Sequence, residues 1–306
     1  MVDPIASAEN STTVRADGPV RLLRAGLGAL QAVAPPLAAA WGERLFRTPR
    51  RHPTPPRERA WLASATQSFV EAGDDVLPVW SWGEGPVVVL AHGWEGRGSQ
   101  MGALGVGLAG AGFRAVAFDG PGHGGARSRL SSLPQLAAGI AAVAAAVDPP
   151  LGPKHPPLGP KNPVRAIVGH SFGAAAASWA VAQGLNVERL VLLAPPFDLD
   201  GYVVQFGDVL GASSRTVAGL VARIERRFAV DWQEARRPAL AAARRAPATR
   251  VLVVHDRDDA ETPWRDGEAV ARSWPRAELV TTTGLGHRRL LRSAEVIRRV
   301  ADFAGP

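Results

Sequence analysis

Five short, almost wholly apolar runs alternate with segments of helical length, and this alternation constrains the fold more than any other feature of the sequence. The apolar runs occupy residues 86–91, 113–118, 164–168, 190–194 and 251–254. Segments of helical length separate most of them, at residues 100–111, 133–147, 172–183 and 264–274. Near-continuous apolar strands are typical of a sheet that is buried on both faces, and strands that alternate with helices form parallel sheets with right-handed crossovers. We therefore predict an α/β fold, doubly wound around a mostly parallel central sheet.

Shorter patterns complete the predicted sheet at its two ends. Residues 69–70 and 76–82 predict an antiparallel hairpin ahead of the first parallel strand. Residues 278–282 predict a last strand and residues 288–303 a closing helix.

Residues 197–247 interrupt the alternation between two of the strands and contain helical stretches at 217–230 and 231–245. In open α/β sheets, ligands bind beyond the carboxyl ends of the strands. An insertion that leaves from that edge would cover the site, so we predict a helical lid. A tandem repeat at residues 150–163 holds too many prolines for helix or sheet and predicts a solvated loop.

The N-terminal part of the chain differs from the rest. Residues 1–18 are polar and small and predict a flexible tail, residues 19–65 predict a helical extension with a proline-rich connector, and residues 66–306 form the predicted α/β domain. Residues 25–42 carry no charge, but Pro35-Pro36 and several glycines make them only weakly apolar. We therefore expect them to pack on the body and expect a cytoplasmic protein; membrane association through an amphipathic anchor stays open as a less favoured alternative.

Composition narrows the classes of function. The absence of cysteine excludes disulfides, thiolate metal sites and cysteine nucleophiles. A net charge of +7 attracts polyanions, but the arginines are scattered along the chain instead of gathering in one aromatic-rich stripe. We expect a small-molecule substrate, no nucleic-acid partner, no metal and no cofactor, and the sequence indicates no oligomeric state.

A Gly-x-Ser-x-Gly motif at residues 169–173 lies directly after one predicted strand and directly before a predicted helix. A serine on such a sharp turn presents its hydroxyl above the sheet edge. The amide of Phe172, at the N-terminus of the helix, then points toward negative charge that develops nearby. We predict Ser171 as a nucleophile; an ordinary helix-capping serine is the alternative.

A serine hydroxyl needs a base, and an acyl transfer also needs donors for the oxyanion. His287 follows the last predicted strand, behind glycines that suit a loop reaching back over the sheet edge, and is the predicted base. The amide of Trp94, just past the strand at 86–91, is the predicted second oxyanion donor beside Phe172. Trp94, Phe197 and Phe206 are candidates for an apolar substrate pocket, with ordinary core packing as the alternative. Three aspartates after the strand at 251–254 leave the orienting acid open.

From about residue 81 onward the sequence resembles the α/β-hydrolase superfamily in its serine esterase branch. The matching segments occur in the family's order, at residues 92–94, 118–124, 169–173, 254–263 and 284–287. The resemblance implies a fold of the α/β-hydrolase type and the triad order Ser171, Asp259, His287, because the family's acid stands four residues before a proline, as Asp259 does before Pro263. Asp256 stands where the family usually has glycine, so Asp258 remains the second choice for the acid.

The serine at this position disfavours the dehalogenase and epoxide-hydrolase branches, which the resemblance associates with aspartate. We predict hydrolysis of carboxylic esters, or of thioesters, through an acyl-enzyme on Ser171. An acyltransferase that uses the same triad and a non-catalytic binding protein that keeps the fold are the two alternatives.

Overall fold

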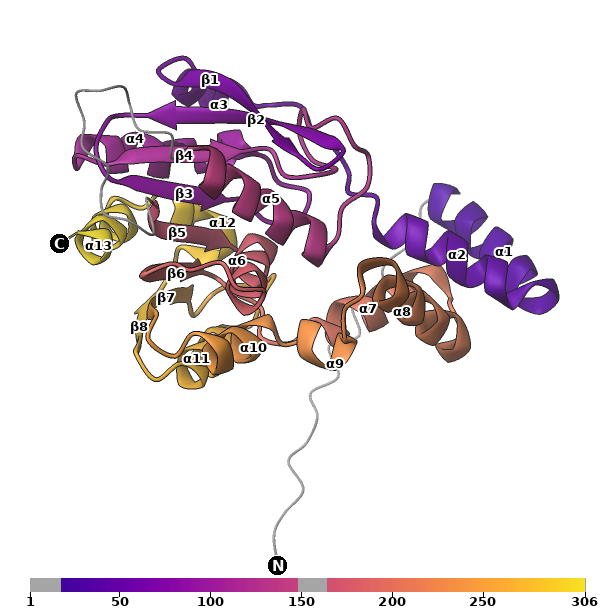
Figure 1. Cartoon of the computed structure of the whole chain (residues 1–306). Coiled ribbons are helices and arrows are strands. Elements are labelled where there is room, and N and C mark those ends of the chain that lie inside the picture. The colour runs from indigo at the N-terminus through magenta and orange to yellow at the C-terminus, as the bar shows by residue number, and fades with distance from the viewer. Residues whose placement is uncertain (1–17, 148–163, 306) are drawn as a thin grey trace, which may run out of the picture.

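The computed structural model describes residues 18–147 and 164–305 (Figure 1). One eight-stranded sheet has the order β1-β2-β4-β3-β5-β6-β7-β8. β1 pairs antiparallel with β2 and β2 with β4, and all other neighbours are parallel. The predicted α/β fold with a mostly parallel sheet is thus confirmed. The strands are β1 Thr66–Ala72, β2 Asp75–Trp82, β3 Val87–Ala91, β4 Arg114–Phe118, β5 Val164–His170, β6 Arg189–Leu193, β7 Arg250–Asp256 and β8 Ala277–Thr282.

The central strands are apolar throughout because each face of the sheet is covered. Val89 and Ile167 belong to one core cluster, whereas their neighbours Val88 and Val168 belong to the cluster on the other face. All four side chains are fully buried. Since successive side chains of a strand point to opposite faces, a run without polar residues is what a doubly covered sheet requires.

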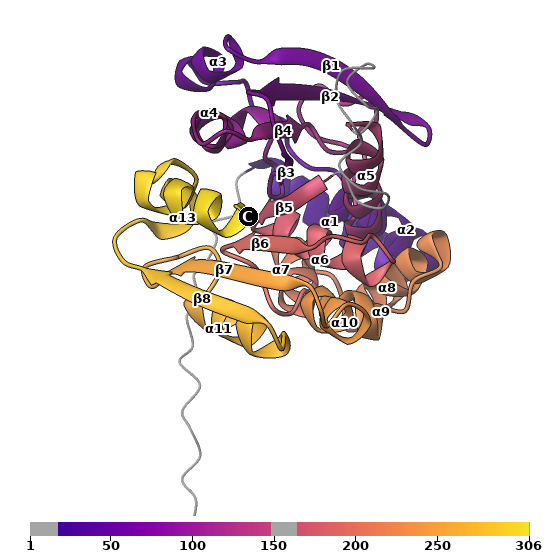
Figure 2. The same ribbon diagram turned by 60° about the vertical axis from the view of Figure 1, so that its left-hand side comes forward.

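Figure 2 shows the sheet between two layers of helices. One layer contains α5 Leu133–Ala146, α6 Phe172–Ala182, α10 Pro238–Arg245 and α11 Trp264–Ser273. The other contains α4 Gly102–Gly110 and α13 Ala294–Ala304, with α3 Pro56–Leu62 and the 3₁₀ turn η1 Gly98–Met101 beside α4. The predicted closing helix at 288–303 is in fact three short pieces, α12 Gly286–Arg289, η2 Leu290–Arg292 and α13, because the Ser293 hydroxyl accepts a hydrogen bond from Val296 N and caps a new helix.

The remaining helices extend from one side of the body (Figure 1). They are α1 Gly18–Val33, α2 Pro35–Phe46, α7 Asp200–Leu210 and α8 Ser214–Phe228, and the single turn α9 Trp232–Ala235 follows α8 and contacts α10. α1 contacts α2 and α7, and α2 packs along α8. We refer to α1, α2, α7 and α8 together as the cap. The N-terminal extension and the insertion, predicted as separate features, are therefore one structural unit.

The predicted lid at 197–247 needs two corrections. The sequence analysis missed α7, and it assigned residues 231–245 to the lid although α10 packs against α6 in the body, where its alanines are buried. The break of the N-terminal helices at Pro35 is as expected. Apart from Gly18, the tail expected at residues 1–18 lies outside the described residues, as does the repeat at 150–163. None of the described helices has the length and apolar character that crossing a membrane would require.

Candidate active site

Ser171 lies on a sharp turn between β5 and α6 with φ 55° and ψ −122°. A non-glycine residue with positive φ is uncommon and costs about 1–3 kcal/mol, so such a conformation persists only where the surroundings enforce it. Its amide donates to Leu193 O at 2.8 Å, and its carbonyl accepts from Ala174 N at 2.9 Å. The turn is therefore fixed on both sides, by the neighbouring strand and by the helix that follows.

The two glycines of the motif are required by close backbone contacts. A Cβ on Gly169 would lie 2.5 Å from the carbonyl oxygen of Gly173, and a Cβ on Gly173 would lie 2.3 Å from the carbonyl oxygen of His92. Side chains at these positions would push the turn away from its neighbours. The glycines thus allow the serine to sit directly beside the loop that follows β3.

His287 and Asp259 form a buried pair at the same edge of the sheet. His287 Nδ1 donates to Asp259 Oδ2 at 2.7 Å. The other carboxylate oxygen accepts from the amides of Glu261, at 2.8 Å, and Thr262, at 2.9 Å. Burial acts to raise the pKa of Asp259, but hydrogen bonds from His255, His287 and the Thr262 amide more than offset it and hold that pKa well below its usual range. Asp259 is thus ionised and accepts the proton on Nδ1, so Nε2 is the ring nitrogen that faces away from the carboxylate bond.

The two other aspartates of this loop have different partners. Asp256 is fully buried, and its Oδ2 accepts from the Thr282 hydroxyl at 2.6 Å and from Leu285 N at 3.0 Å. Exposed Asp258 accepts from Gly284 N at 2.8 Å. Both carboxylates brace the loop that carries His287, whereas the imidazole itself contacts Asp259.

Two further histidines contact this pair, and the sequence analysis did not assign them to it. His255 Nε2 lies 3.3 Å from Asp259 Oδ2 and 3.0 Å from Thr262 O. His170 Nε2 donates to His287 O at 2.9 Å, with the two rings 4.7 Å apart. Burial, together with the neighbouring imidazole of His287, lowers the pKa of His170 to about 3, so it is neutral. The available sequence signal was a histidine at the carboxyl end of two of the predicted strands, at residues 170 and 255.

The loop after β3 lies against the serine. A Cβ on Gly93 would lie 3.1 Å from Ser171 Cβ, and the rings of Trp94 and Phe172 pack edge to face at 5.3 Å. The amide of Phe172 has no intrahelical acceptor because it opens α6. No acceptor for the amide of Trp94 is found among residues 18–147 and 164–305. Both predicted donors thus have uncommitted N–H groups.

His92 braces this loop, as expected. Its Nδ1 donates to Gly93 O at 2.7 Å, and its Nε2 accepts from Gly120 N at 2.9 Å. Burial lowers the pKa of His92 to about 4, so the ring is neutral and fixed in one tautomer. It joins the loop after β3 to the turn after β4.

A cavity of about 750 Å³ opens at this edge of the sheet, and both Ser171 and His287 line it. Of the residues predicted to line a substrate pocket, Trp94 and Phe206 do so. Phe197 does not: its ring lies 5.7 Å from the Arg237 guanidinium, and it packs against the core. In the part of the chain that the structure describes, no group of three or more His, Asp or Glu side chains is arranged to hold a metal ion.

Comparisons with known proteins agree with this fold. The model of the alpha/beta hydrolase family matches residues 88–299, so the chain belongs to the alpha/beta hydrolase family. None of the curated proteins matches the sequence significantly.

Solved structures of several hydrolases share the fold at low identity. An esterase from Pyrococcus furiosus aligns with a TM-score of 0.61 at 16% identity, over 84% of this chain and 97% of its own. An esterase from Exiguobacterium antarcticum aligns with a TM-score of 0.55 at 16% identity, over 78% of this chain and 99% of its own. An epoxide hydrolase from Vigna radiata aligns with a TM-score of 0.55 at 18% identity, over 79% of this chain and 97% of its own. Because neighbours with different chemistries fit about equally well, the reaction has to be argued from the site.

Proposed function

We propose that this alpha/beta hydrolase cleaves carboxylic esters, with thioesters as chemically similar substrates, through an acyl-enzyme on Ser171. The observation that carries the proposal is the pairing of a strained serine turn with a buried His287–Asp259 hydrogen bond of 2.7 Å, both at one cavity. A serine at this turn favours acyl transfer because its oxygen, once deprotonated, attacks a carbonyl carbon directly.

In the proposed reaction His287 Nε2 removes the hydroxyl proton of Ser171 as the oxygen attacks the ester carbonyl. Asp259 keeps the imidazole in the tautomer with the proton on Nδ1 and stabilises the imidazolium that forms. The imidazolium then gives its proton to the leaving alkoxide, and the alcohol departs. Water, deprotonated by His287, attacks the acyl-enzyme carbonyl. The bond between the carbonyl carbon and Ser171 Oγ then breaks, Oγ takes the proton back from His287, and the carboxylic acid leaves.

The negative charge of each tetrahedral intermediate would be stabilised by the amides of Trp94 and Phe172. Their uncommitted N–H groups, and the position of Phe172 at the N-terminus of α6, support this assignment. Donors that are fixed before the reaction need no reorganisation, and each is worth about 3–4 kcal/mol of barrier in comparable sites.

The test is covalent labelling with a fluorophosphonate, followed by assays with p-nitrophenyl acetate. We expect wild type to label on Ser171 and Ser171→Ala to lose both the label and ester turnover. Ser131→Ala is the matched control, because Ser131 also lines the cavity and its buried hydroxyl has no partner among the described residues. The control should label like wild type. A wild-type protein that neither labels nor hydrolyses short esters would contradict the proposal and favour a non-catalytic binding protein.

A further inference from the structure

The cavity beside Ser171 has two chemically different ends. Where the cap surrounds it, the lining is apolar and comes from helices far apart in sequence: Leu23, Phe46, Phe206, Val209, Leu210 and Ile224. These helices contact one another, so their lining residues form one continuous wall. The other end is bounded by charged residues of the first turn of α3 and of the segment after His287, among them Arg57 and Arg292.

We infer that the cap end binds the acyl chain of a medium- or long-chain ester and that the N-terminal helices α1 and α2 form part of this pocket. The inference rests on the proposed function for the identity of the reacting bond. A cavity of about 750 Å³ is large for an acetyl group and lies well within the range of about 300–1,000 Å³ that ligand pockets occupy. An alkyl chain gains free energy along an apolar wall and gains none beside solvated guanidinium groups.

The orientation of the substrate follows from the charges. Within the described residues, Arg57 and Arg292 have no ion-pair partner, whereas Arg97 is paired with Glu58 at 2.8 Å. An alkyl chain at that end would have to displace water from unpaired cations. The polar alcohol half of the ester therefore faces the charged end, and the acyl half faces the cap.

Specific hydrogen bonds hold α1 in the wall of the pocket. The Arg24 guanidinium donates to Val209 O at 2.7 Å and to Asp208 O at 3.0 Å, at the end of α7. Gln31 Oε1 accepts from the Thr216 hydroxyl on α8 at 2.8 Å. These contacts attach α1 to both helices of the insertion.

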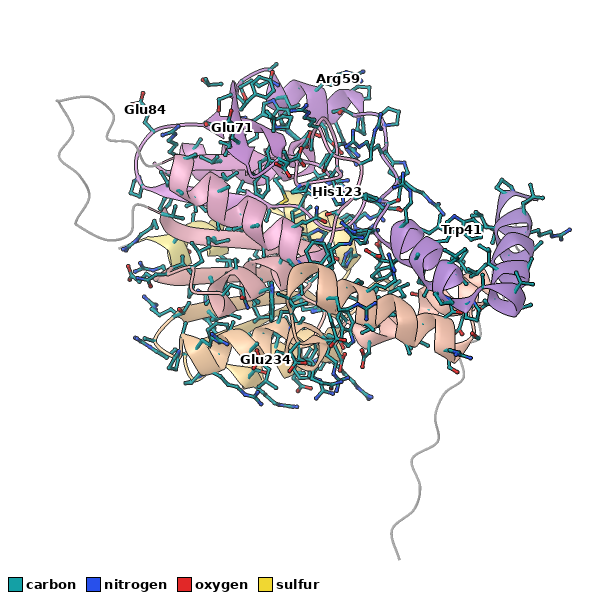
Figure 3. All side chains as sticks on the ribbon, turned by 45° about the vertical axis from the view of Figure 1, so that its right-hand side comes forward. Trp41, Arg59, Glu71, Glu84, His123 and Glu234 are labelled. Carbon is teal, nitrogen blue, oxygen red and sulfur yellow. The ribbon has the colours of Figure 1, made fainter. Side chains whose placement is uncertain are left out.

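The two N-terminal helices also pack closely on each other. A Cβ on Gly26 would lie 3.1 Å from the Trp41 ring, and Figure 3 shows Trp41 between the two helices. Leu27 is fully buried beside them. Residues 18–46 lie before the family match, which begins at residue 88, so the pocket includes a segment outside the matched residues.

The first experiment measures kcat/KM on p-nitrophenyl esters from acetate to palmitate. In wild type we expect a rise of up to about fourfold for each added methylene that the pocket buries, followed by a plateau. Leu23→Trp fills the pocket, and the ratio of laurate to acetate hydrolysis should fall by at least about tenfold, as expected for a loss of two or more buried methylenes. Leu22→Trp is the matched control on the same helix, because Leu22 is 76% exposed, and it should keep the wild-type ratio.

Val20→Trp provides a second pocket-filling variant at the first turn of α1, should Leu23→Trp fold poorly. A wild-type enzyme that hydrolyses acetate best, or pocket variants that keep the wild-type ratio, would overturn the acyl pocket while leaving ester hydrolysis intact.

A binding measurement separates the pocket from the reaction. Ser171→Ala protein is titrated with cis-parinaric acid, a long-chain fatty acid whose fluorescence rises in apolar surroundings. We expect saturable binding that laurate displaces and acetate does not, and that Leu23→Trp abolishes in the same background. If this pattern appears but wild type hydrolyses no ester of any length, the pocket stands and the proposed function fails. Absence of saturable binding would overturn the pocket.

Discussion

The sheet edge that carries Ser171 and the cap that covers it are built in different ways. At the sheet edge, Ser171, Asp259 and His287 each lie within a few residues of a strand end, and hydrogen bonds fix the backbone of the serine turn and join His287 to Asp259. The cap is assembled from two segments about 180 residues apart, held by apolar contacts, by hydrogen bonds and by ion pairs to the buried Glu43. From this difference we infer that the sheet edge determines the reaction and that the cap determines which length of acyl chain is preferred.

A buried ion cluster around Glu43 links the helices of the cap. Glu43, only 2% exposed, accepts from Arg47 at 2.8 Å on its own helix and from Arg223 at 2.8 Å and Arg227 at 2.7 Å on α8. Arg47 also donates to Gln135 on α5 at 3.0 Å. The cluster therefore joins α2 both to the insertion and to the body.

The largest effect should come from the proposed orienting acid, Asp259, and it tests whether the sheet edge determines the reaction independently of the cap. Asp259→Asn leaves His287 in the wrong tautomer, so we expect kcat to fall by about 10⁴-fold, and by the same factor for short and long esters. Asp258→Asn, which only weakens an exposed hydrogen bond accepted from Gly284 N, should lower kcat by less than about tenfold.

Steady-state assays on acetate and laurate esters measure both variants. Equal losses from Asp259→Asn and Asp258→Asn would show that Asp259 is not the acid. If the loss of kcat depended on the length of the acyl chain, the sheet edge and the cap would not act separately.

The second effect concerns the cap and is a change in stability. Glu43→Gln leaves three arginines without their shared carboxylate, and we expect the free energy of unfolding to fall by about 3 kcal/mol, the lower end for a broken buried pair because Arg223 and Arg227 are partly exposed. Urea denaturation near neutral pH measures the change. Glu234→Gln is the control, since its surface pair with Arg245 at 3.8 Å is worth less than about 1 kcal/mol. Turnover of the acetate ester by Glu43→Gln should stay close to that of wild type.

The contribution of Glu43 also has a definite pH dependence. Burial acts to raise the pKa of Glu43, but hydrogen bonds from Arg227, Arg47 and Arg223 outweigh it and place the folded pKa below the ordinary 4.5. A carboxyl group with a lowered folded pKa stabilises the protein fully above its unfolded pKa and loses that contribution as the pH falls through the folded one. The difference between wild type and Glu43→Gln should therefore shrink in acid. A constant difference would mean that packing, and not charge, links α2 to α8.

The two regions also differ in how far the sequence predicts them. The turn that carries Ser171 and the loop that carries His287 follow strands closely, so local motifs predict their places. The choice of Asp259 among three neighbouring aspartates came from the family resemblance. The joining of α1 and α2 to the insertion depends on contacts such as Gln31 to Gly211, which no local pattern encodes. α7 was missed because two glycines and a Val-Val pair give residues 200–210 a low helix propensity, which packing overrides. Without that helix, Phe197 and Phe206 look equivalent in sequence, although only Phe206 lines the cavity.

The smallest predicted effect concerns His255, which the sequence analysis did not assign and whose Nε2 lies 3.3 Å from Asp259 Oδ2. Because a hydrogen bond to a charged group is worth about 1.5–3 kcal/mol, we expect His255→Leu to lower kcat by about 10- to 100-fold. KM should not change, since His255 is fully buried and is not among the residues that line the cavity. His255→Gln restores an N–H donor toward Asp259 Oδ2 and should recover most of the activity. Fluorophosphonate titration of the reactive serine corrects both variants for misfolded protein. If His255→Gln is as impaired as His255→Leu after that correction, or if KM rises with the fall in kcat, His255 acts through packing and not through the carboxylate.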